Sequence, residues 1–409
     1  MTEASKAIRH KNFYRELDAI LRRIDEEQGL ESMLTTILSQ IGAEVLRTET
    51  GISSGRLYRR DGKNYVIVRS FGARGRDLLG ERVPADYPIF DHLTHDRVTY
   101  VFPESEGFDS QIEARLGVST FAAFALDADR EYVAAFGIEE GAEVNEVMLT
   151  LNALRYAIAH RLKELSLEGQ IREARDIQLS LLPQSAPSFP GYEVAGRSEP
   201  AETVGGDIYD LIAVDEHLLG VAIGDASGHG LPAALQARDV ITGLRMGVEK
   251  DLKVTSVMQR LNRVIHRSGL TSRFVSLFYG ELEPSGNFVY VNAGHDPVLL
   301  LRSDGGTEQL RSTGIVMGPL AEAKYRRELV HLEPGDVLLL YTDGAVERLD
   351  ARNDEEFGMD RLEKVTRRAL ASGDGLAELP GRILEDVRAF GGGAPLADDV
   401  TIVLVRRDG

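Results

Sequence analysis

The sequence predicts an α+β protein in which two domains are joined by a long helix, and three observations lead to that expectation. The chain has 409 residues, which is too long for one ordinary hydrophobic core. Short β-like segments fill residues 51–142 and return from Tyr192 onward. Residues 143–182, which lie between them, carry a helical pattern instead. The expected parts are an N-terminal helix over 1–27, a first domain over 28–164, a linker helix over 143–183 and a second domain over 188–409.

The first part of the chain is predicted to form helix, followed by short strands. Residues 11–46 place apolar side chains at helical spacing, with Gly29 between two stripes. Strand-like pieces broken by Gly, Pro and Asp follow, and one helix is expected at 107–117. This pattern is typical of an α+β sensory domain. The expected strands are 55–60, 65–72, 97–102, 121–126 and 132–139.

A long helix is expected from about Glu143 to Leu182, where Pro183 ends it. Its apolar stripe could pair with a second chain as a parallel coiled coil, which would make the protein a homodimer. Because Arg161 and Glu168 interrupt the heptads, such a coil could shift between registers and pass a signal to the second domain. A merely structural connector is the alternative. The stripe consists of Leu151, Leu154, Ile158, Leu162 and Leu165, then Ile171, Ala174, Ile177 and Leu181.

The second domain is expected to be rich in strands. From Tyr192 onward, strand-like segments alternate with helical stretches at 231–267, 359–370 and 375–390. Hairpin signals such as EPSGN at 283–287 favour antiparallel pairing. The expected architecture is therefore an α-β-β-α sandwich, in which helices cover a β-sandwich from outside.

Composition narrows the classes of function. A net charge of −18 and a pI near 5.0 argue against a protein that binds nucleic acid or a membrane surface. The sequence has no Cys, which excludes disulfides, zinc–thiolate sites and a cysteine nucleophile, and fits a reducing cytoplasm. No run of 18 apolar residues occurs, and the N-terminus lacks an apolar segment of secretory length. We therefore expect a cytoplasmic protein.

Five aspartates fall in four short motifs at the ends of strand-like segments, where side chains from separate strands can converge. Two ionised carboxylates about 4 Å apart repel by roughly 4 kcal/mol, and divalent cations would cancel that repulsion. Oxygen ligands without Cys favour magnesium or manganese over zinc. The motifs are VGGDIYD (204–210), IGDASGHG (223–230), LYTDGAVE (340–347) and ADDVTIVLV (397–405), which contain Asp207, Asp225, Asp343, Asp398 and Asp399.

The order and wording of these motifs resemble the SpoIIE-like branch of the type 2C, metal-dependent serine/threonine protein phosphatases. The resemblance covers about residues 172–407, including ARDIQLSLLPQ at 174–184 and the block at 274–301. It implies that two Mn²⁺ or Mg²⁺ ions, with a weak third in some members, activate a water that hydrolyses phosphoserine or phosphothreonine. It also implies a small substrate protein of the STAS fold, an anti-sigma-factor antagonist in stress-response partner switching.

The resemblance assigns a role to each matching residue. Asp225 would bridge the two metals, and the backbone carbonyl of Ala226 would be the ligand beside it. Asp343 and Asp398 would complete the second metal site. Asp207 would orient the attacking water from outside the metal ligands.

Further residues in or near these motifs have less defined roles. Glu347 matches a position linked to the third metal. Asp399 is the alternative ligand to its neighbour, because adjacent strand residues point to opposite faces. His229 could donate a proton to the leaving oxygen, or could instead cap the helix that follows. His295 is expected to hold its turn by hydrogen bonds, and Arg197 is a weak candidate for a phosphate-gripping cation.

Residues 28–164 resemble a GAF domain, more loosely and without a diagnostic motif. The resemblance implies that an unknown small ligand or a protein signal acts on this domain. Because the chain has no Cys, a thioether-linked bilin is excluded. His92 and His95 are expected at the surface rather than on a haem.

Three functions remain after the sequence analysis. The first is a signalling phosphatase regulated by its sensor domain. The second is a catalytically idle receptor that binds a partner protein through a phosphatase-like domain. The third is a two-metal nuclease, which the acidic composition disfavours because it offers no evident groove for nucleic acid.

Overall fold

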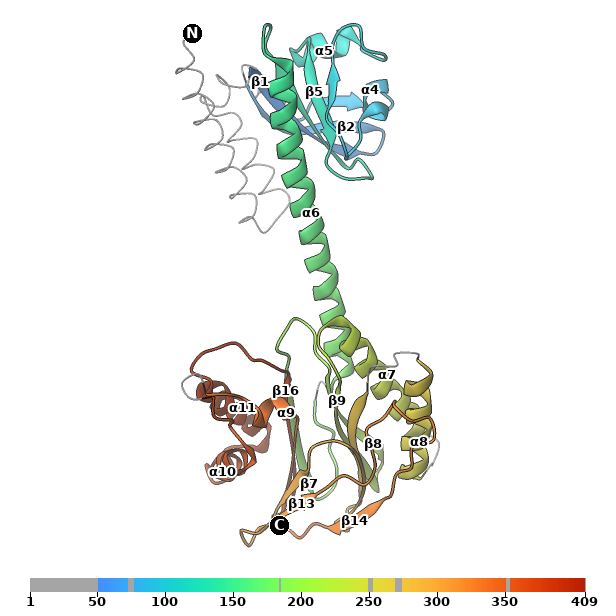
Figure 1. Cartoon of the computed structure of the whole chain (residues 1–409), viewed down its shortest axis with the longest axis vertical. Coiled ribbons are helices and arrows are strands. Elements are labelled where there is room, and N and C mark those ends of the chain that lie inside the picture. The colour runs from blue at the N-terminus through green and yellow to red at the C-terminus, as the bar shows by residue number, and fades with distance from the viewer. Residues whose placement is uncertain are drawn as a thin grey trace. The chain divides into compact units, whose positions relative to one another are not determined.

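The computed structural model describes residues 51–72, 77–183, 185–248, 253–268, 274–350 and 354–408 (Figure 1). The predicted N-terminal helix over 1–27 lies outside these residues. The chain divides into two compact units between Gly169 and Gln170. None of the described helices is both long and apolar enough to cross a membrane.

A six-stranded antiparallel sheet forms the first unit, with strand order β3-β2-β1-β6-β5-β4. The sequence predicted every strand except β3, whose three residues are too few to show a pattern. The strands are β1 (Ile52–Asp61), β2 (Asn64–Phe71), β3 (Arg82–Pro84), β4 (Thr99–Val101), β5 (Phe121–Ala125) and β6 (Tyr132–Ile138).

Each face of this sheet has its own core. The short helices α4 (Pro88–His92) and α5 (Ser110–Leu116) belong to one core, which contains Phe90 and Leu116. The long helix α6 (Val144–Leu181) packs its N-terminal turns into the other core. Strands β5 and β6 are buried along their whole length, because both of their faces are covered.

Helix α6 ends one residue before the predicted end, but its first half corrects the predicted coiled-coil stripe. Leu151, Leu154 and Ile158 are at most 2% exposed, and they pack against the sheet of the first unit. These side chains are therefore not available to pair with a second chain. Apolar spacing defines a buried helix face, and it does not distinguish a sheet from another helix as the surface that buries it.

The second unit contains two five-stranded antiparallel sheets, as the hairpin signals predicted. One sheet has the order β14-β11-β10-β9-β8, and the other has the order β13-β12-β15-β16-β7. The strands are β7 (Tyr192–Glu199), β8 (Asp207–Asp215), β9 (Leu218–Ala226), β10 (Val275–Leu282), β11 (Asn287–Ala293), β12 (Val298–Leu301), β13 (Thr307–Leu310), β14 (Glu328–His331), β15 (Val337–Tyr341) and β16 (Val400–Arg407).

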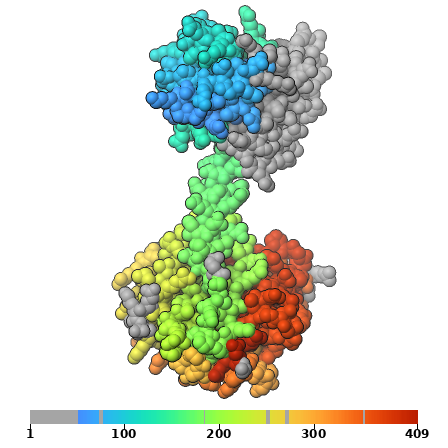
Figure 2. All heavy atoms as spheres, turned by 180° about the vertical axis from the view of Figure 1, so that it is seen from behind, coloured from blue at the N-terminus to red at the C-terminus, as the bar shows by residue number. Residues whose placement is uncertain are grey.

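Helices cover the outer faces of both sheets, so the second unit has the predicted α-β-β-α layers (Figure 1). In the space-filling view these two helical groups, one yellow and one red, lie on opposite sides of the second unit (Figure 2). Helices α7 (Leu231–Val248) and α8 (Val254–Arg267) cover the first sheet, whereas α9 (Asp343–Val346), α10 (Met359–Leu370), the 3-10 turn η1 (Leu376–Glu378) and α11 (Leu379–Phe390) lie beside the second.

Aromatic side chains fill the space between the two sheets. Phe278 is fully buried, and its ring centroid lies 5.3 Å from that of Tyr290 and 6.1 Å from that of Phe288. We expect Phe278→Ala to lower the free energy of unfolding by about 3–5 kcal/mol, because it leaves a cavity that rigid neighbours cannot fill. Urea denaturation followed by circular dichroism measures this loss. Leu329→Ala, at a 65% exposed position of the same sheet, should change stability by less than about 0.5 kcal/mol.

Candidate functional site

Two of the predicted site residues face each other across a hairpin. Asp207 begins β8 and lies directly opposite Asp225 on β9. The Asp207 side chain is buried, and its Oδ2 atom accepts hydrogen bonds from the hydroxyls of Thr342 (2.7 Å) and Thr401 (2.6 Å). These threonines come from the other sheet, so Asp207 joins the two sheets at this end. Burial, followed by the charge of Asp225, raises the pKa of Asp207 well above its usual range and favours its neutral form.

Asp225 lies in an acidic environment built by both sheets. Burial is the largest cause that raises the pKa of Asp225 to about 7, and the charges of Asp343, Asp398 and Asp399 add to it. Asp343 follows β15 and Asp398 precedes β16, whereas Asp225 belongs to the other sheet. The structure thus brings carboxylates from three separate motifs into one electrostatically coupled cluster.

Asp343 belongs to the same cluster. The pKa of Asp343 is raised to about 6, chiefly by burial and then by the charges of Asp398, Glu347 and Asp296. Glu347 is exposed at the end of α9, and its backbone N–H donates to the carbonyl of Asp343 (2.8 Å). The sequence analysis did not assign Asp296 a role, although it directly follows His295 in the motif NAGHDP.

Asp398 and Asp399 have different surroundings. The Asp399 carboxylate is 6% exposed and accepts backbone N–H groups from Ala201 (2.8 Å), Gly206 (2.6 Å) and Asp207 (3.4 Å). Asp398 is exposed, and its Oδ1 atom accepts the backbone N–H of Asp399 (2.8 Å). Asp399 therefore fixes the loop before β8, while the second carboxylate oxygen of Asp398 has no comparable backbone contacts.

The donor set fits a hard divalent cation. Its side-chain donors are carboxylate oxygens, which magnesium and manganese prefer. A Cβ atom at Gly206 would lie 2.5 Å from the carbonyl oxygen of Ala226 and 3.0 Å from Oδ1 of Asp225, so only glycine leaves these oxygens accessible. Within the described ranges, no three His, Asp or Glu side chains converge closely enough to enclose an ion. Carboxylates that repel one another stay apart unless a cation lies between them.

His229 lies in the loop that leads from β9, the strand that carries Asp225, into α7. Gly228 and Gly230 on either side have φ angles of 95° and 70°, which only glycine adopts without strain. The imidazole is 83% exposed, and its Nδ1 atom lies 3.0 Å from a carboxylate oxygen of Glu202. An exposed imidazole beside a carboxylate can exchange protons with solvent and with a bound ligand.

His295 and Arg197, which the sequence analysis also considered, make structural contacts instead. His295 is buried, its Nδ1 atom lies 2.9 Å from the Ser276 hydroxyl, and its Nε2 atom lies 3.1 Å from the Tyr341 carbonyl. Burial lowers the pKa of His295 to about 4, so it is neutral and holds its turn as expected. Arg197 points toward Gly381 of α11, where a Cβ atom would lie 3.2 Å from its guanidinium, and it is therefore not at the site.

Sequence reasoning missed a contact between the end of α6 and the site. The Gln178 side chain donates to the carbonyl of Gly205 (2.5 Å) and accepts its N–H (3.2 Å). Arg245 of α7 donates to the carbonyl of Leu181 (2.8 Å) and forms a two-point ion pair with the buried Asp210 (2.7 and 3.1 Å). The end of α6 is thus held against the strand that begins with Asp207. Gln178 lies in the segment ARDIQLSLLPQ, but a polar residue on a helix carries no local signal for such a contact.

Comparisons with known proteins agree with this geometry. Residues 215–408 match the family model described as Stage II sporulation protein E. Protein IcfG of Synechocystis sp. is 28% identical over 295 residues, which are 64% of this chain and 45% of that protein. Phosphoserine phosphatase RsbU of Bacillus subtilis is 29% identical over 183 residues, which are 44% of this chain and 54% of that protein. The chain thus spans about half the length of these curated relatives.

A solved structure supports the fold. The PP2C domain of SiaA from Pseudomonas aeruginosa superimposes with a TM-score of 0.52 at 19% identity, and the match covers 60% of this chain and 99% of that domain. At this identity the likeness establishes the PP2C-type fold alone. The two layered sheets, the ordered acidic motifs and the family match all point to the same similarity, which is between residues 215–408 of this chain and the SpoIIE family.

Proposed function

We propose that the second unit is a metal-dependent phosphatase that hydrolyses phosphoserine or phosphothreonine on a small regulatory protein. The observation that carries this proposal is the coupled cluster of Asp225, Asp343 and Asp398, built from both sheets inside the region that matches the family. A purely structural role would not require acidic neighbours that raise the pKa of Asp225 and of Asp343, because the repulsion between these carboxylates destabilises the fold.

The residues of the cluster would hold two divalent ions, Mn²⁺ or Mg²⁺. Asp225 would serve both sites, and the carbonyl of Ala226 would be the ligand beside it. Asp343 and Asp398 would complete the second site, and Glu347 would serve a weak third ion. When bound, the ions would supply Lewis-acid activation of a water molecule and neutralise charge on the phosphate.

The chain's own residues would orient the reactants. Two threonine hydroxyls fix Oδ2 of Asp207, which leaves Oδ1 pointing in one direction where it can orient a water molecule by a hydrogen bond. We assign Asp399 a positioning role rather than a ligand role, because its oxygens already accept backbone N–H groups.

The substrate is proposed to be a phosphorylated protein of the STAS fold. Two curated relatives from Bacillus subtilis, RsbU and RsbP, are named phosphoserine phosphatases, which supports a protein phosphoester as the substrate class. A phosphate-release assay of the full chain against phosphorylated STAS proteins, with p-nitrophenyl phosphate as the generic comparison, tests the proposal. Release that requires Mn²⁺ or Mg²⁺ is the expected result. Binding of the phosphoprotein without release in either metal would instead identify an idle receptor.

His229 is proposed to protonate the leaving oxygen. A serine alkoxide is a poor leaving group and needs a proton, whereas p-nitrophenolate leaves without one. We expect His229→Ala to lower kcat for a phosphoserine protein by about 10²-fold and to leave p-nitrophenyl phosphate turnover within about threefold. An equal loss with both substrates contradicts proton donation. His217→Ala, at a site 78% exposed on the hairpin between β8 and β9, is the matched control.

The end of α6 is proposed to regulate the site through Gln178. Removing this side chain leaves the N–H and carbonyl of Gly205 without their partner and frees the loop before Asp207. We expect Gln178→Ala to lower kcat/KM about 10-fold to 100-fold, as is usual for residues that orient a metal site, and to cost about 1 kcal/mol of stability. Steady-state kinetics and urea denaturation measure the two effects. Gln170→Ala, two helical turns earlier, should change neither.

A homodimer through α6 remains a proposal, now with a different set of residues. Leu149, Tyr156 and Ile177 share one heptad position, Leu167 lies at the position that completes the seam, and these side chains are 65%, 67%, 55% and 48% exposed. These four side chains, rather than the buried Leu151, would form the seam between two parallel chains. Light scattering at micromolar concentration tests it, and a monomer mass would remove the proposal.

A further inference from the structure

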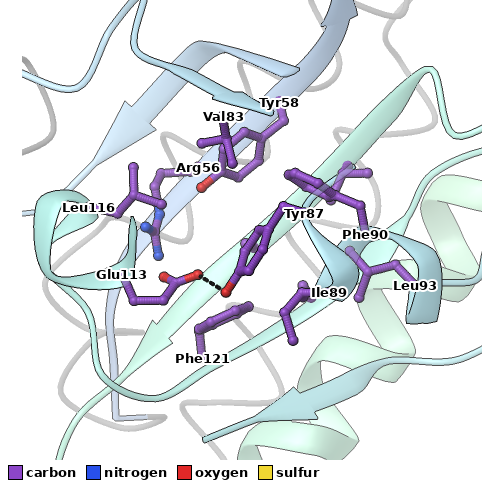
Figure 3. Close-up of a pocket in the computed structure, with 13 residues that line it drawn as sticks. Arg56, Tyr58, Val83, Tyr87, Ile89, Phe90, Leu93, Glu113, Leu116 and Phe121 are labelled. Atoms are coloured by element: carbon purple, nitrogen blue, oxygen red, sulfur yellow. Dashed lines mark hydrogen bonds between the residues drawn. The ribbon is translucent and has the colours of Figure 1, made fainter. Parts of the chain in front are cut away.

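The first unit contains a small, partly open cavity between its sheet and the short helices α4 and α5. Its volume is about 20 Å³. Apolar walls come from Val83, Ile89, Phe90, Leu116 and Phe121, and the polar lining consists of Arg56, Glu113 and the tyrosines Tyr58 and Tyr87 (Figure 3). A void of this size holds at least one water-sized group, so it is too large to be a packing imperfection and too small for a ring.

Arg56 is the unusual member of this lining. It lies in the middle of β1, a central strand, opposite Ala135 of β6, and it is only 1% exposed. Its Nε and Nη1 atoms have no hydrogen-bond partner. A buried guanidinium with unsatisfied donors is strongly unfavourable, because the lost hydration is not replaced. Such a group in a well-packed sheet indicates that another molecule supplies the partner.

Glu113 does not supply that partner. Its carboxylate is 3% exposed and accepts the Tyr87 hydroxyl (3.0 Å), which in turn accepts the backbone N–H of Asp109 (3.3 Å). Burial raises the pKa of Glu113, and the charge of Arg56 opposes that rise, so the two side chains interact electrostatically, although no ion pair within 4.0 Å is found between these two described residues. Figure 3 shows the ends of Arg56, Glu113 and Tyr87 directed toward the same space. The cavity therefore lies between a guanidinium that hydrogen-bonds Tyr58 but leaves its Nε and Nη1 atoms without a partner, and a carboxylate that is already held by Tyr87.

We propose that this cavity binds a small planar oxyanion, such as a carboxylate, nitrate or bicarbonate, on the guanidinium of Arg56. The planar fork of an Arg side chain donates two parallel hydrogen bonds to such a group. The small volume limits the ligand to the smallest oxyanions. Glu113 faces the same space, so its charge opposes a doubly charged anion more strongly than a singly charged one.

Isothermal titration of the full chain without metal, using formate, nitrate and bicarbonate with chloride as the reference salt, tests the proposal. At least one of the three oxyanions is expected to bind at a single site and to raise the thermal midpoint of the first unit by about 5 °C near saturation. Of the three anions, only bicarbonate carries a hydroxyl that can donate to Glu113. Glu113→Gln is therefore expected to weaken the binding of bicarbonate and to leave the binding of nitrate and formate unchanged.

Two variants of Arg56 decide the assignment. Arg56→Met removes the buried charge at similar volume, and it should fold, lose the anion response and leave the midpoint without anion unchanged or higher. Arg56→Lys keeps the charge but lacks the planar fork, so it should weaken anion binding at least about tenfold. This variant tests the proposal if the Met variant does not fold. Arg60→Gln, exposed on the same strand, should respond like the natural chain. No response to any of the three anions, or an equal response in the Arg56 variants, would overturn the proposal.

Discussion

Replacing Asp225 with Asn is expected to abolish turnover and, at the same time, to stabilise the protein in the absence of metal. The charges of Asp343, Asp398 and Asp399 all raise the pKa of Asp225, so a bound cation would interact most strongly with this acid. We expect phosphate release to fall on the order of 10³-fold, because losing one electrostatic contact to reacting groups in a buried site has an effect of this size. Initial rates with Mn²⁺ at saturating concentration measure it.

The expected gain in stability follows from the direction of the pKa change. The pKa of Asp225 is about 7 in the folded protein, above its usual 3.8, so the folded state holds a proton that the unfolded chain releases. The stability of the metal-free protein therefore falls as the pH rises from about 4 to about 7, and it stays lower above that. Asn carries no charge, so Asp225→Asn should gain about 2–4 kcal/mol at pH 8 and almost nothing at pH 4.

Urea denaturation in a chelator at the two pH values measures this difference. Asp360→Asn, an exposed acid at the start of α10, should show neither the gain nor the loss of activity. If the variant is no more stable than the natural chain at pH 8, the repulsion within the cluster is not real and the metal site loses its main support. If it is more stable and still active, Asp225 is not the bridging acid.

The adjacent acids Asp398 and Asp399 are expected to separate activity from stability. Asp398→Ala removes an exposed carboxylate that raises the pKa of both Asp225 and Asp343, so it should lower activity on the order of 10³-fold without loss of stability. Asp399→Ala leaves the N–H groups of Ala201 and Gly206 without acceptors inside the protein. It should therefore lower the free energy of unfolding by about 3 kcal/mol.

The measurements are Mn²⁺-dependent phosphate release and urea denaturation on both variants. Asp304→Ala is the control. The Asp304 carboxylate accepts one backbone N–H in an exposed turn, so its removal should lower the free energy of unfolding by less than about 1 kcal/mol. Exchanged phenotypes, in which Asp399→Ala is stable and inactive while Asp398→Ala is unstable and active, would assign the ligand role to Asp399.

Much of the fold could be predicted because its elements have strong local signals. The predicted helices at 231–267, 359–370 and 375–390 correspond to α7 with α8, to α10 and to η1 with α11. Pro183 predicted the end of α6 to within about one residue. The short elements β3, α4, β13, β14 and α9 were missed, because three to five residues are too few for a hydrophobic period to emerge. The GAF resemblance of the first unit stays a prediction.

The sequence by itself determined on which strand ends the five predicted acids lie, whereas their role as metal ligands stays a prediction. The 18 residues between Asp207 and Asp225 suffice for one hairpin, and those two acids are opposite each other in β8 and β9. Only the tertiary structure decided which hydrogen-bond partners these side chains have. It turned Asp399 toward the backbone of the loop before β8, gave Asp207 the hydroxyls of Thr342 and Thr401, and placed Gln178 on Gly205.

The physical reason is that sequence periodicity reports burial and not the neighbour that causes it. Strand β16 is buried from Val400 to Val405 on both faces, so no alternation shows which side of the preceding acids turns inward. The same holds for α6, where Leu151 has helical spacing whether a sheet or a second chain covers it. Hydrogen bonds between residues more than 100 positions apart, such as Thr401 to Asp207, depend on how the two sheets stack, and no local pattern encodes that.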